Sequence, residues 1–285
     1  MQQKNEKMLL EIVKTLQKLR QEKPLIDCIT NRVTINDCAN ILLAAGGSPI
    51  MAEDEREIDE IISISQGLVL NLGILDQKIV STMLMAGKKA KQTGIPVIFD
   101  PVGAGASRLR DDLAQMILNE VRPDVIRGNF SEIRALSGAA IQSRGVDAAA
   151  EDAVNEENMQ VCGKMVQELA TKYQCTVCAT GAIDLVSDGE QIFYIKNGDP
   201  MLCDVTGTGC MCSALTGATC AAGGALNGAV AAVVLLGLAG EYAAEACRKN
   251  GDGIGTFRVK MMDAIYLIRE KDIMERGEVY GGELL

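Results

Sequence analysis

Apolar runs of strand length alternate with segments of helical periodicity in this chain, and this alternation restricts its fold more than any other feature. The expected strands are short and almost wholly apolar, at 24–29, 48–51, 67–71, 95–99, 124–126 and 175–179. The expected helices lie between them, at 36–45, 53–65, 76–92, 109–121 and 159–173. Such alternation is typical of a mostly parallel sheet with helices on both faces, whose buried strands lack polar alternation. We therefore predict an α/β fold with three layers.

The remaining segments fit one domain spanning residues 1–285. Residues 184–187 and 191–196 are expected to pair as a hairpin around Asp188-Gly189. Residues 142–158 are polar and acidic, which predicts an exposed connection. The N-terminal segment 1–21 is predicted to form an amphipathic helix. No linker or internal repeat divides the sequence.

An uncharged stretch, 205–240, raises the question of a membrane segment. Its longest clean apolar piece, 228–240, is shorter than the ~20 residues that a spanning helix needs. Glycines divide the rest, so we expect two small-residue helices buried in a core or a subunit interface, and no membrane partner.

The chain contains no histidine, which removes most familiar acid–base devices. Ser-His-Asp and Cys-His pairs, histidine-bearing zinc sites and the kinase catalytic loop that begins with histidine are all excluded. Proton transfer must fall to a carboxylate, thiol, lysine or phenol. With 28 basic against 38 acidic residues the net charge is −10, so nucleic acid is a poor candidate partner.

Ten cysteines lie mostly within apolar stretches, as buried thiols in a reducing compartment do. Cys175 and Cys178 form a C-x-x-C pair, but they fall on an expected strand and have no partner pair for zinc. The N-terminus lacks the apolar core of a signal peptide. We expect a cytoplasmic protein.

The strongest local motif runs from Asp204 to Cys210, where a glycine-rich turn opens directly into an uncharged helix. Unpaired N–H groups at such a helix start form an anion site, and glycine lets the anion approach closely. A glycine turn before a packed helix is the structural alternative. Cys210 would lie in the first turn, where the helix dipole is expected to lower its pKa and make it a candidate base.

Polar side chains also follow three of the expected strands. Asp100 precedes a Pro/Gly turn, Arg127 and Glu132 flank the end of the next strand, and Thr180 ends a third. Glu132 stands three residues after Asn129, so a capping box is its alternative explanation. Parallel sheets collect strand ends at one edge, and two carboxylates beside a phosphate cradle suit Mg-nucleotide phosphoryl transfer.

Taken in order, the motifs resemble hydroxyethylthiazole kinases. The similar segments are Ile29-Thr-Asn31, Ala45-Gly-Gly-Ser-Pro-Ile-Met51, Asp100-Pro-Val-Gly-Ala-Gly105, Gly128-Asn129-x-x-Glu132, Thr180-Gly181, Asn197-Gly-x-Pro200, Val205-Thr-Gly-Thr-Gly-Cys210 and Gly255-Thr-Phe-Arg-Val-Lys260. The resemblance covers nearly the whole chain. It implies a ribokinase-like fold, a homotrimer with active sites between subunits, and phosphorylation of 4-methyl-5-(2-hydroxyethyl)thiazole with ATP and Mg²⁺ in thiamine salvage.

The resemblance also implies roles for single residues. Met51 and Gly207 match thiazole-binding positions, with Asn31 expected beside them. Arg127 and Thr180 match ATP-contacting positions, and Asp100 and Glu132 match the acids that organise magnesium. Cys210 stands where related kinases have an aspartate base.

Other functions remain open from the sequence. The same fold serves kinases of hydroxymethylpyrimidine or other vitamin alcohols, and nucleotide-dependent repair dehydratases. A non-catalytic nucleotide or thiazole sensor is a further alternative, although a binder has no need of both acids and Cys210 together.

Overall fold

The structure, a computed structural model, describes residues 4–138 and 154–283 and is built on one nine-stranded sheet. The strand order is β2-β1-β3-β4-β5-β6-β7-β8-β9. The first six strands in this order are parallel, and the last three join antiparallel. Their bounds are β1 Leu25–Ile29, β2 Ser48–Ile50, β3 Gly67–Asn71, β4 Val97–Asp100, β5 Val125–Asn129, β6 Thr176–Thr180, β7 Asp184–Ser187, β8 Gln191–Ile195 and β9 Val279–Glu283.

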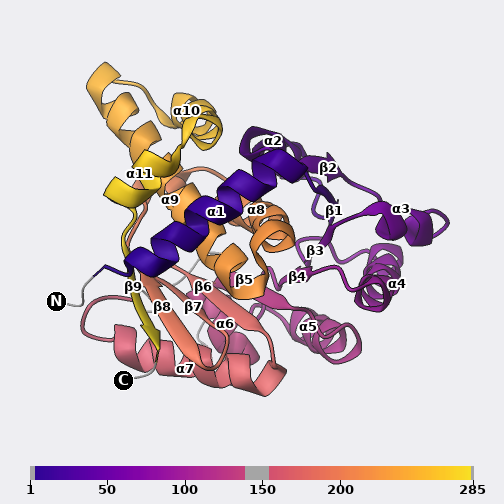
Figure 1. Cartoon of the computed structure of the whole chain (residues 1–285). Coiled ribbons are helices and arrows are strands. Elements are labelled where there is room, and N and C mark those ends of the chain that lie inside the picture. The colour runs from indigo at the N-terminus through magenta and orange to yellow at the C-terminus, as the bar shows by residue number, and fades with distance from the viewer. Residues whose placement is uncertain (1–3, 139–153, 284–285) are drawn as a thin grey trace.

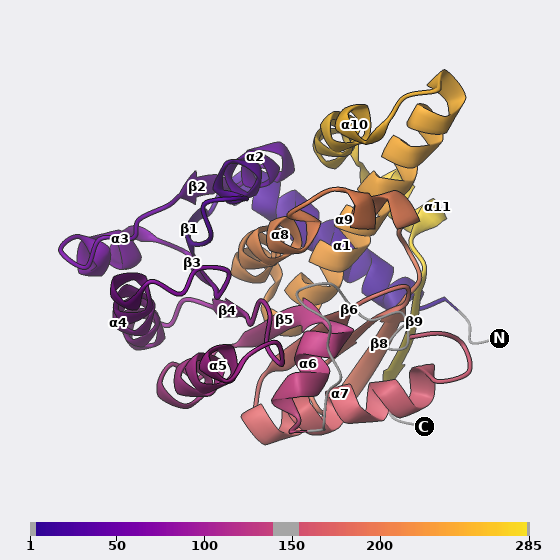
Figure 2. The same cartoon turned by 180° about the vertical axis from the view of Figure 1, so that it is seen from behind.

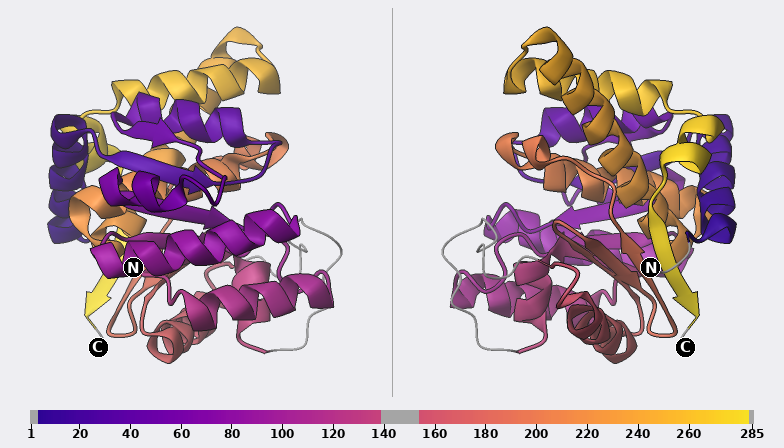
Figure 3. Two further views of the ribbon diagram at one scale, coloured as in Figure 1. Left: turned by 90° about the vertical axis from the view of Figure 1, so that its right-hand side faces the viewer. Right: turned by 90° about the vertical axis from the view of Figure 1, so that its left-hand side faces the viewer.

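Helices cover both faces of this sheet (Figures 1 and 2). One layer holds α1 Glu6–Glu22, α2 Ile35–Ala45, α8 Thr208–Gly223, α9 Ala225–Asn250, α10 Ile254–Leu267 and α11 Glu270–Arg276. The other holds α3 Ile58–Ile64, α4 Gln77–Thr93, α5 Arg108–Glu120, α6 Phe130–Leu136 and α7 Met159–Tyr173. The side views of Figure 3 show the sheet between the two layers. The predicted three-layer α/β/α architecture is confirmed.

The strands other than β2 contribute to two separate cores, which explains the lack of polar alternation. In β1, Ile26 and Cys28 pack toward α1 and α8, whereas Ile29 packs toward α3 and α4. Both sets of side chains are buried. A strand enclosed on both faces must be apolar at successive positions.

The uncharged stretch forms two core helices, as predicted. In α8, Gly217 lies so close to β3 that an added Cβ would come within 2.7 Å of Val69 Cγ2. Helix α9 continues past the apolar piece to Asn250 and, within the described ranges, is the one helix long and apolar enough to cross a membrane. Of its most apolar window, 78% is buried inside the protein. Neighbouring helices therefore cover this surface.

Two expectations need correction. The helix expected at 53–65 is shorter, Ile58–Ile64, because Asp54 Oδ1 accepts a hydrogen bond from Arg56 N at 3.0 Å and holds a turn there. Strand β9 was not foreseen; it pairs antiparallel with β8, and an isolated bridge between Lys4 and Tyr280 joins it to the N-terminal segment. Of the acidic connection expected at 142–158, residues 142–153 lie outside the described residues.

Candidate active site

The parallel strands bring polar residues together at their carboxyl ends. Asn71 at the end of β3 is in register with Asp100 at the end of β4. Asn129 at the end of β5 is in register with Thr180 at the end of β6. Helix α8 begins at this same edge, since Arg127 of β5 contacts Gly209 in its first turn. Residues far apart in the sequence thus form one site.

The start of α8 has the geometry of an anion site. Gly207, the N-cap, has φ +88°, and a Cβ there would lie 2.5 Å from Thr34 Cγ2. The first helical hydrogen bond runs from Met211 N to Gly207 O at 2.8 Å. The N–H groups of residues 208–210 therefore lie beyond the helical ladder, at the positive end of the dipole. Gly207 is needed here for both its backbone angle and the lack of a side chain.

Two asparagine amides converge on Cys210, the third residue of α8. Asn31 Nδ2 donates to Cys210 Sγ at 3.3 Å, and Asn71 Nδ2 donates to the same sulfur at 3.4 Å. The predicted closeness of Asn31 to the glycine loop is also seen, because Thr34, which contacts Gly207, donates through Oγ1 to Asn31 Oδ1 at 3.1 Å.

The expectation of a lowered Cys210 pKa is wrong. Burial raises the pKa of the thiol, and the negative charge of Asp100 raises it further. Hydrogen bonds from Thr34, Asn31 and Asn71 oppose this rise without reversing it. The dipole argument applies to an open helix start, whereas this thiol is half-buried near a carboxylate. A neutral thiol is therefore the resting form.

Asp100 is the most enclosed acid of the site, with 1% of its surface exposed. Its Oδ2 accepts from Ser213 Oγ at 2.7 Å and from Asn71 Nδ2 at 2.8 Å. The Arg127 guanidinium lies 4.0 Å from the same oxygen. Burial raises the pKa of Asp100, and these three partners counteract the rise. The carboxylate is held in a single orientation.

Arg127 links the strand ends to the loop. Its Nη1 donates to Gly209 O at 2.9 Å, and its Nη2 donates to Thr180 Oγ1 at 2.7 Å. The structure therefore brings together the two residues expected to contact nucleotide. It also gives Arg127 a structural role, because its bond to Gly209 ties β5 to the first turn of α8.

Glu132 forms the capping box that was its alternative explanation. Asn129 Oδ1 accepts from Glu132 N at 2.8 Å, and Glu132 Oε2 accepts from Asn129 N at 2.8 Å. The other oxygen accepts from Gly103 N, at 2.7 Å, in the turn that follows Asp100. Burial, followed by the charge of Asp100, raises the pKa of Glu132 to about 7. Glu132 thus joins two of the strand-end loops electrostatically and through hydrogen bonds.

These acids fit magnesium only in its usual nucleotide-bound form. In the part of the chain that the structure describes, no three Cys, Asp or Glu side chains gather as a metal cage. Magnesium typically takes one or two carboxylates and completes its shell with phosphates and water. Asp100 and Glu132, coupled by charge at one edge, match that limited donor set.

Met51 follows β2, which pairs with β1 at the border of the site. It is partly buried against the core that also contacts Cys210. The next residue, Ala52, donates its N–H to Asp27 Oδ1 at 3.0 Å. Asp27 is fully buried, its Oδ2 has no hydrogen-bond partner, and burial raises its pKa to about 7.

Three residues with clear contacts in or beside the site were not expected: Asn71, Ser213 and Asp27. Asn71 carried a usable signal, a polar residue ending an apolar strand, like Asp100. Ser213 and Asp27 carried none, because one lies inside an uncharged helix and the other inside a strand.

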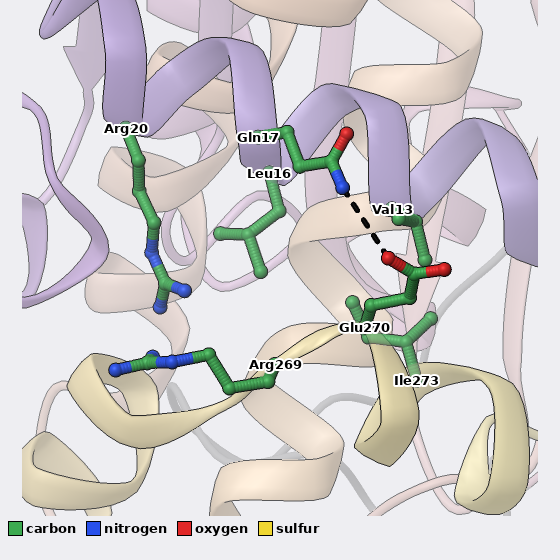
Figure 4. Close-up of a pocket in the computed structure, with 7 residues that line it drawn as sticks. All are labelled: Val13, Leu16, Gln17, Arg20, Arg269, Glu270 and Ile273. Atoms are coloured by element: carbon green, nitrogen blue, oxygen red, sulfur yellow. Dashed lines mark hydrogen bonds between the residues drawn. The ribbon is translucent and has the colours of Figure 1, made fainter.

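The pocket in Figure 4 lies elsewhere, between α1 and the start of α11, with a volume of about 230 Å³. Its two arginines bind the last carbonyls of α10: Arg20 Nη1 donates to Ile268 O at 2.7 Å, and Arg269 Nη1 donates to Tyr266 O at 2.8 Å. Cations at a helix C-terminus are stabilised by its dipole. This pair is explained by capping.

Comparison with known proteins places the chain in a family. The family model described as the hydroxyethylthiazole kinase family matches residues 16–271. The chain belongs to the hydroxyethylthiazole kinase family. Among its relatives, the hydroxyethylthiazole kinase of Alkaliphilus oremlandii (strain OhILAs) is 43% identical over 270 residues, which cover 94% of this chain and 97% of the relative.

Solved structures give the same result for the fold. The hydroxyethylthiazole kinase structure from Pyrococcus horikoshii OT3 is 37% identical, with a TM-score of 0.84 over 95% of this chain and 98% of that one. A ribokinase-like superfamily protein from Enterococcus faecalis V583 is similar in fold alone, with 13% identity and a TM-score of 0.60, covering 92% of this chain and 93% of that one. The resemblance to hydroxyethylthiazole kinases and the ribokinase-like fold are both confirmed.

Proposed function

We propose that this protein transfers the γ-phosphoryl group of ATP to the hydroxyl of 4-methyl-5-(2-hydroxyethyl)thiazole, giving 4-methyl-5-(2-phosphooxyethyl)thiazole and ADP in thiamine diphosphate biosynthesis. The observation that most directly supports this proposal is the geometry at the start of α8. Its glycine turn leaves N–H groups for an anion, while Cys210 and buried Asp100 lie within one asparagine side chain of each other. Relatives across the family carry the name of this kinase.

The substrate hydroxyl would lie beside Cys210, with the thiazole ring bordered by Met51, Asn31 and Gly207. The hydroxyl oxygen forms a bond to the γ-phosphorus as the bond from that phosphorus to ADP breaks. Donors of the α8 start are suited to the charge on the transferred group. Cys210 orients the hydroxyl and accepts its proton late, because a loose transition state makes little demand on a strong base. Because burial leaves the resting thiol neutral, its own proton must pass to solvent before the sulfur can accept the substrate proton.

Arg127 and Thr180 are the proposed nucleotide contacts. They are already bonded to each other at 2.7 Å and to the loop through Gly209. Asp100 and Glu132 are the proposed holders of Mg²⁺. When bound, the metal supplies positive charge to the phosphates.

We also propose a cytoplasmic homotrimer with active sites between subunits, in which residues 1–285 act as one kinase domain. Three of the apolar side chains on α2 and α10 that are more than half exposed, Leu43, Val259 and Tyr266, lie close together. They line a groove of about 520 Å³ that also contains Asp37 and Arg258, which form an ion pair. Helix α2 begins just after Asn31, so a subunit seated here would border the site. Ten free thiols agree with a reducing compartment.

The deciding assay is ADP release with the thiazole present, absent, and present without Mg²⁺. We expect release only when thiazole, ATP and Mg²⁺ are all supplied. Preferential turnover of hydroxymethylpyrimidine would move the activity to the alternative kinase class. Binding of thiazole and ATP without ADP formation would favour a sensor. Light scattering of the parent and of Val259→Glu tests the trimer, since a buried charge at this groove should release monomers.

A further inference from the structure

Asn71 lies at the centre of the site and uses both ends of its amide. It ends β3, and 1% of its surface is exposed. Its Oδ1 accepts from Asn31 Nδ2 at 3.1 Å and from Gly73 N at 2.9 Å. Its Nδ2 donates to Asp100 Oδ2 at 2.8 Å and to Cys210 Sγ at 3.4 Å. All its hydrogen-bonding capacity is directed at neighbours in or beside the site.

The orientation of this amide is determined by a backbone group. A backbone N–H is only a donor, so Gly73 N must face the amide oxygen rather than the nitrogen. The Nδ2 group then has to face Asp100 and the sulfur. A flipped amide would set its oxygen against the Asp100 carboxylate, which has nothing to donate when ionised.

The same reasoning holds for Asn31, the second donor to the sulfur. Its Oδ1 accepts from Val33 N and Thr34 N, both at 3.1 Å, so its Nδ2 must point away from them. Cys210 Sγ consequently meets two N–H donors, neither of which can rotate to offer an acceptor. Such donors stabilise the sulfur as it gains negative charge, because hydrogen bonds to charged groups are the stronger ones.

We propose that Asn71 is a positioning residue of the phosphoryl transfer, whose single amide holds the Cys210 sulfur and the Asp100 carboxylate at a constant separation. This inference rests on the proposed function. The Asn71 side chain thereby links Cys210, the proposed acceptor of the substrate proton, to Asp100, a proposed holder of Mg²⁺. A displacement of either group is transmitted to the other through the amide.

Ser213 provides a matched control for this role. It is as buried as Asn71 and donates to the same oxygen of Asp100, at 2.7 Å. No hydrogen bond connects its side chain to Cys210 among those of the described residues. Asn71→Ala therefore removes contacts to both groups, whereas Ser213→Ala removes a contact to Asp100 alone.

The test compares steady-state kinetics with the reactivity of Cys210 in enzyme without substrates. Iodoacetamide alkylation is followed over pH by peptide mass spectrometry that separates Cys210 from exposed Cys203. We expect Asn71→Ala to lower kcat on the order of ten- to a hundredfold, with the KM for ATP nearly unchanged. The pH midpoint of Cys210 alkylation should rise by about one pH unit. Asp100 and Cys38, the titratable groups that interact electrostatically with Cys210, stay in place in both variants.

Ser213→Ala should lower kcat without moving that midpoint. Equal kinetic losses in the two variants, with the midpoint unmoved in both, would overturn the proposal. If Asn71→Ala does not fold, Asn71→Thr removes the amide donor while adding no charge and leaving less empty space, and a rise of the midpoint is expected again. Parent enzyme that releases no ADP with the thiazole would refute the proposed function instead. The alkylation comparison needs no substrate and would still decide the contact to the sulfur.

Discussion

Asp27 should destabilise the protein at neutral pH, and replacing it by asparagine should remove that cost. The carboxyl lies in the middle of β1, fully buried, with Oδ1 bonded to Ala52 N and Oδ2 without a partner. Burial raises its pKa from the usual 3.8 to about 7. The folded protein therefore binds a proton that the unfolded chain has already released between these two values.

The sign follows from this difference in bound protons. Where the folded state binds more protons than the unfolded state, stability falls as pH rises. The loss begins near pH 3.8 and is complete above about pH 7. A rise of this size is worth ~4 kcal/mol at ~1.4 kcal/mol per pH unit.

Asparagine reproduces the neutral side chain at every pH and keeps the acceptor for Ala52 N–H. We expect Asp27→Asn to be ~2–4 kcal/mol more stable than the parent at pH 8. This advantage should shrink by ~2–3 kcal/mol on going to pH 5. Urea unfolding at pH 5, 6.5 and 8 measures it, with Asp112→Asn, an exposed change on α5, as the control.

An advantage that stays constant with pH, or a variant less stable than the parent at pH 8, would refute the reasoning. Activity gives an independent check. Asp27→Asn should leave the KM for the thiazole unchanged, because the Ala52 N–H that steadies Met51 keeps its acceptor. Asp27→Ala removes the acceptor and should raise this KM.

Three further substitutions test the site. Cys210→Ala should lower kcat about a hundredfold or more, as loss of a proton acceptor does, with calorimetric ATP binding largely intact; undiminished turnover would remove the thiol from the mechanism. Gly207→Ala would place a side chain on a residue with a left-handed φ of +88°, with its Cβ 2.5 Å from Thr34 Cγ2. We expect it to lower the free energy of unfolding in urea by more than ~1 kcal/mol and to weaken phosphate binding. A stability and a KM for ATP equal to those of the parent would contradict the anion loop. Arg127→Lys cannot reach Gly209 O and Thr180 Oγ1 together, so the KM for ATP should rise; an unchanged KM would leave Arg127 a purely structural residue.

Much of the fold was predictable because its signals are local. Runs such as 67–71 and 159–173 match strand and helix to the residue, since composition and periodicity change sharply at their ends. The helix predicted for residues 53–57 was wrong because a local hydrogen bond to Asp54 forms a turn there. Strand β9 was not predicted because its partner β8 lies far away in the sequence and its own segment is rich in glycine.

The sequence by itself determined which groups are available for chemistry. Without histidine, and with Asp100, Arg127, Glu132, Thr180 and Cys210 at strand or helix ends, it pointed to a metal- and backbone-assisted phosphoryl transfer. The order of the motifs pointed to the hydroxyethylthiazole kinase family, which the comparisons confirm.

Only the tertiary structure decided how these groups behave. The helix position of Cys210 suggested a lowered pKa, but burial and the charge of Asp100 raise it instead. Asn71 acquires its importance from partners on β4 and α8. The pKa of a side chain depends on how far it is buried, on the charges near it and on the hydrogen bonds it accepts. Separate segments of the chain supply these surroundings, so they exist only after folding.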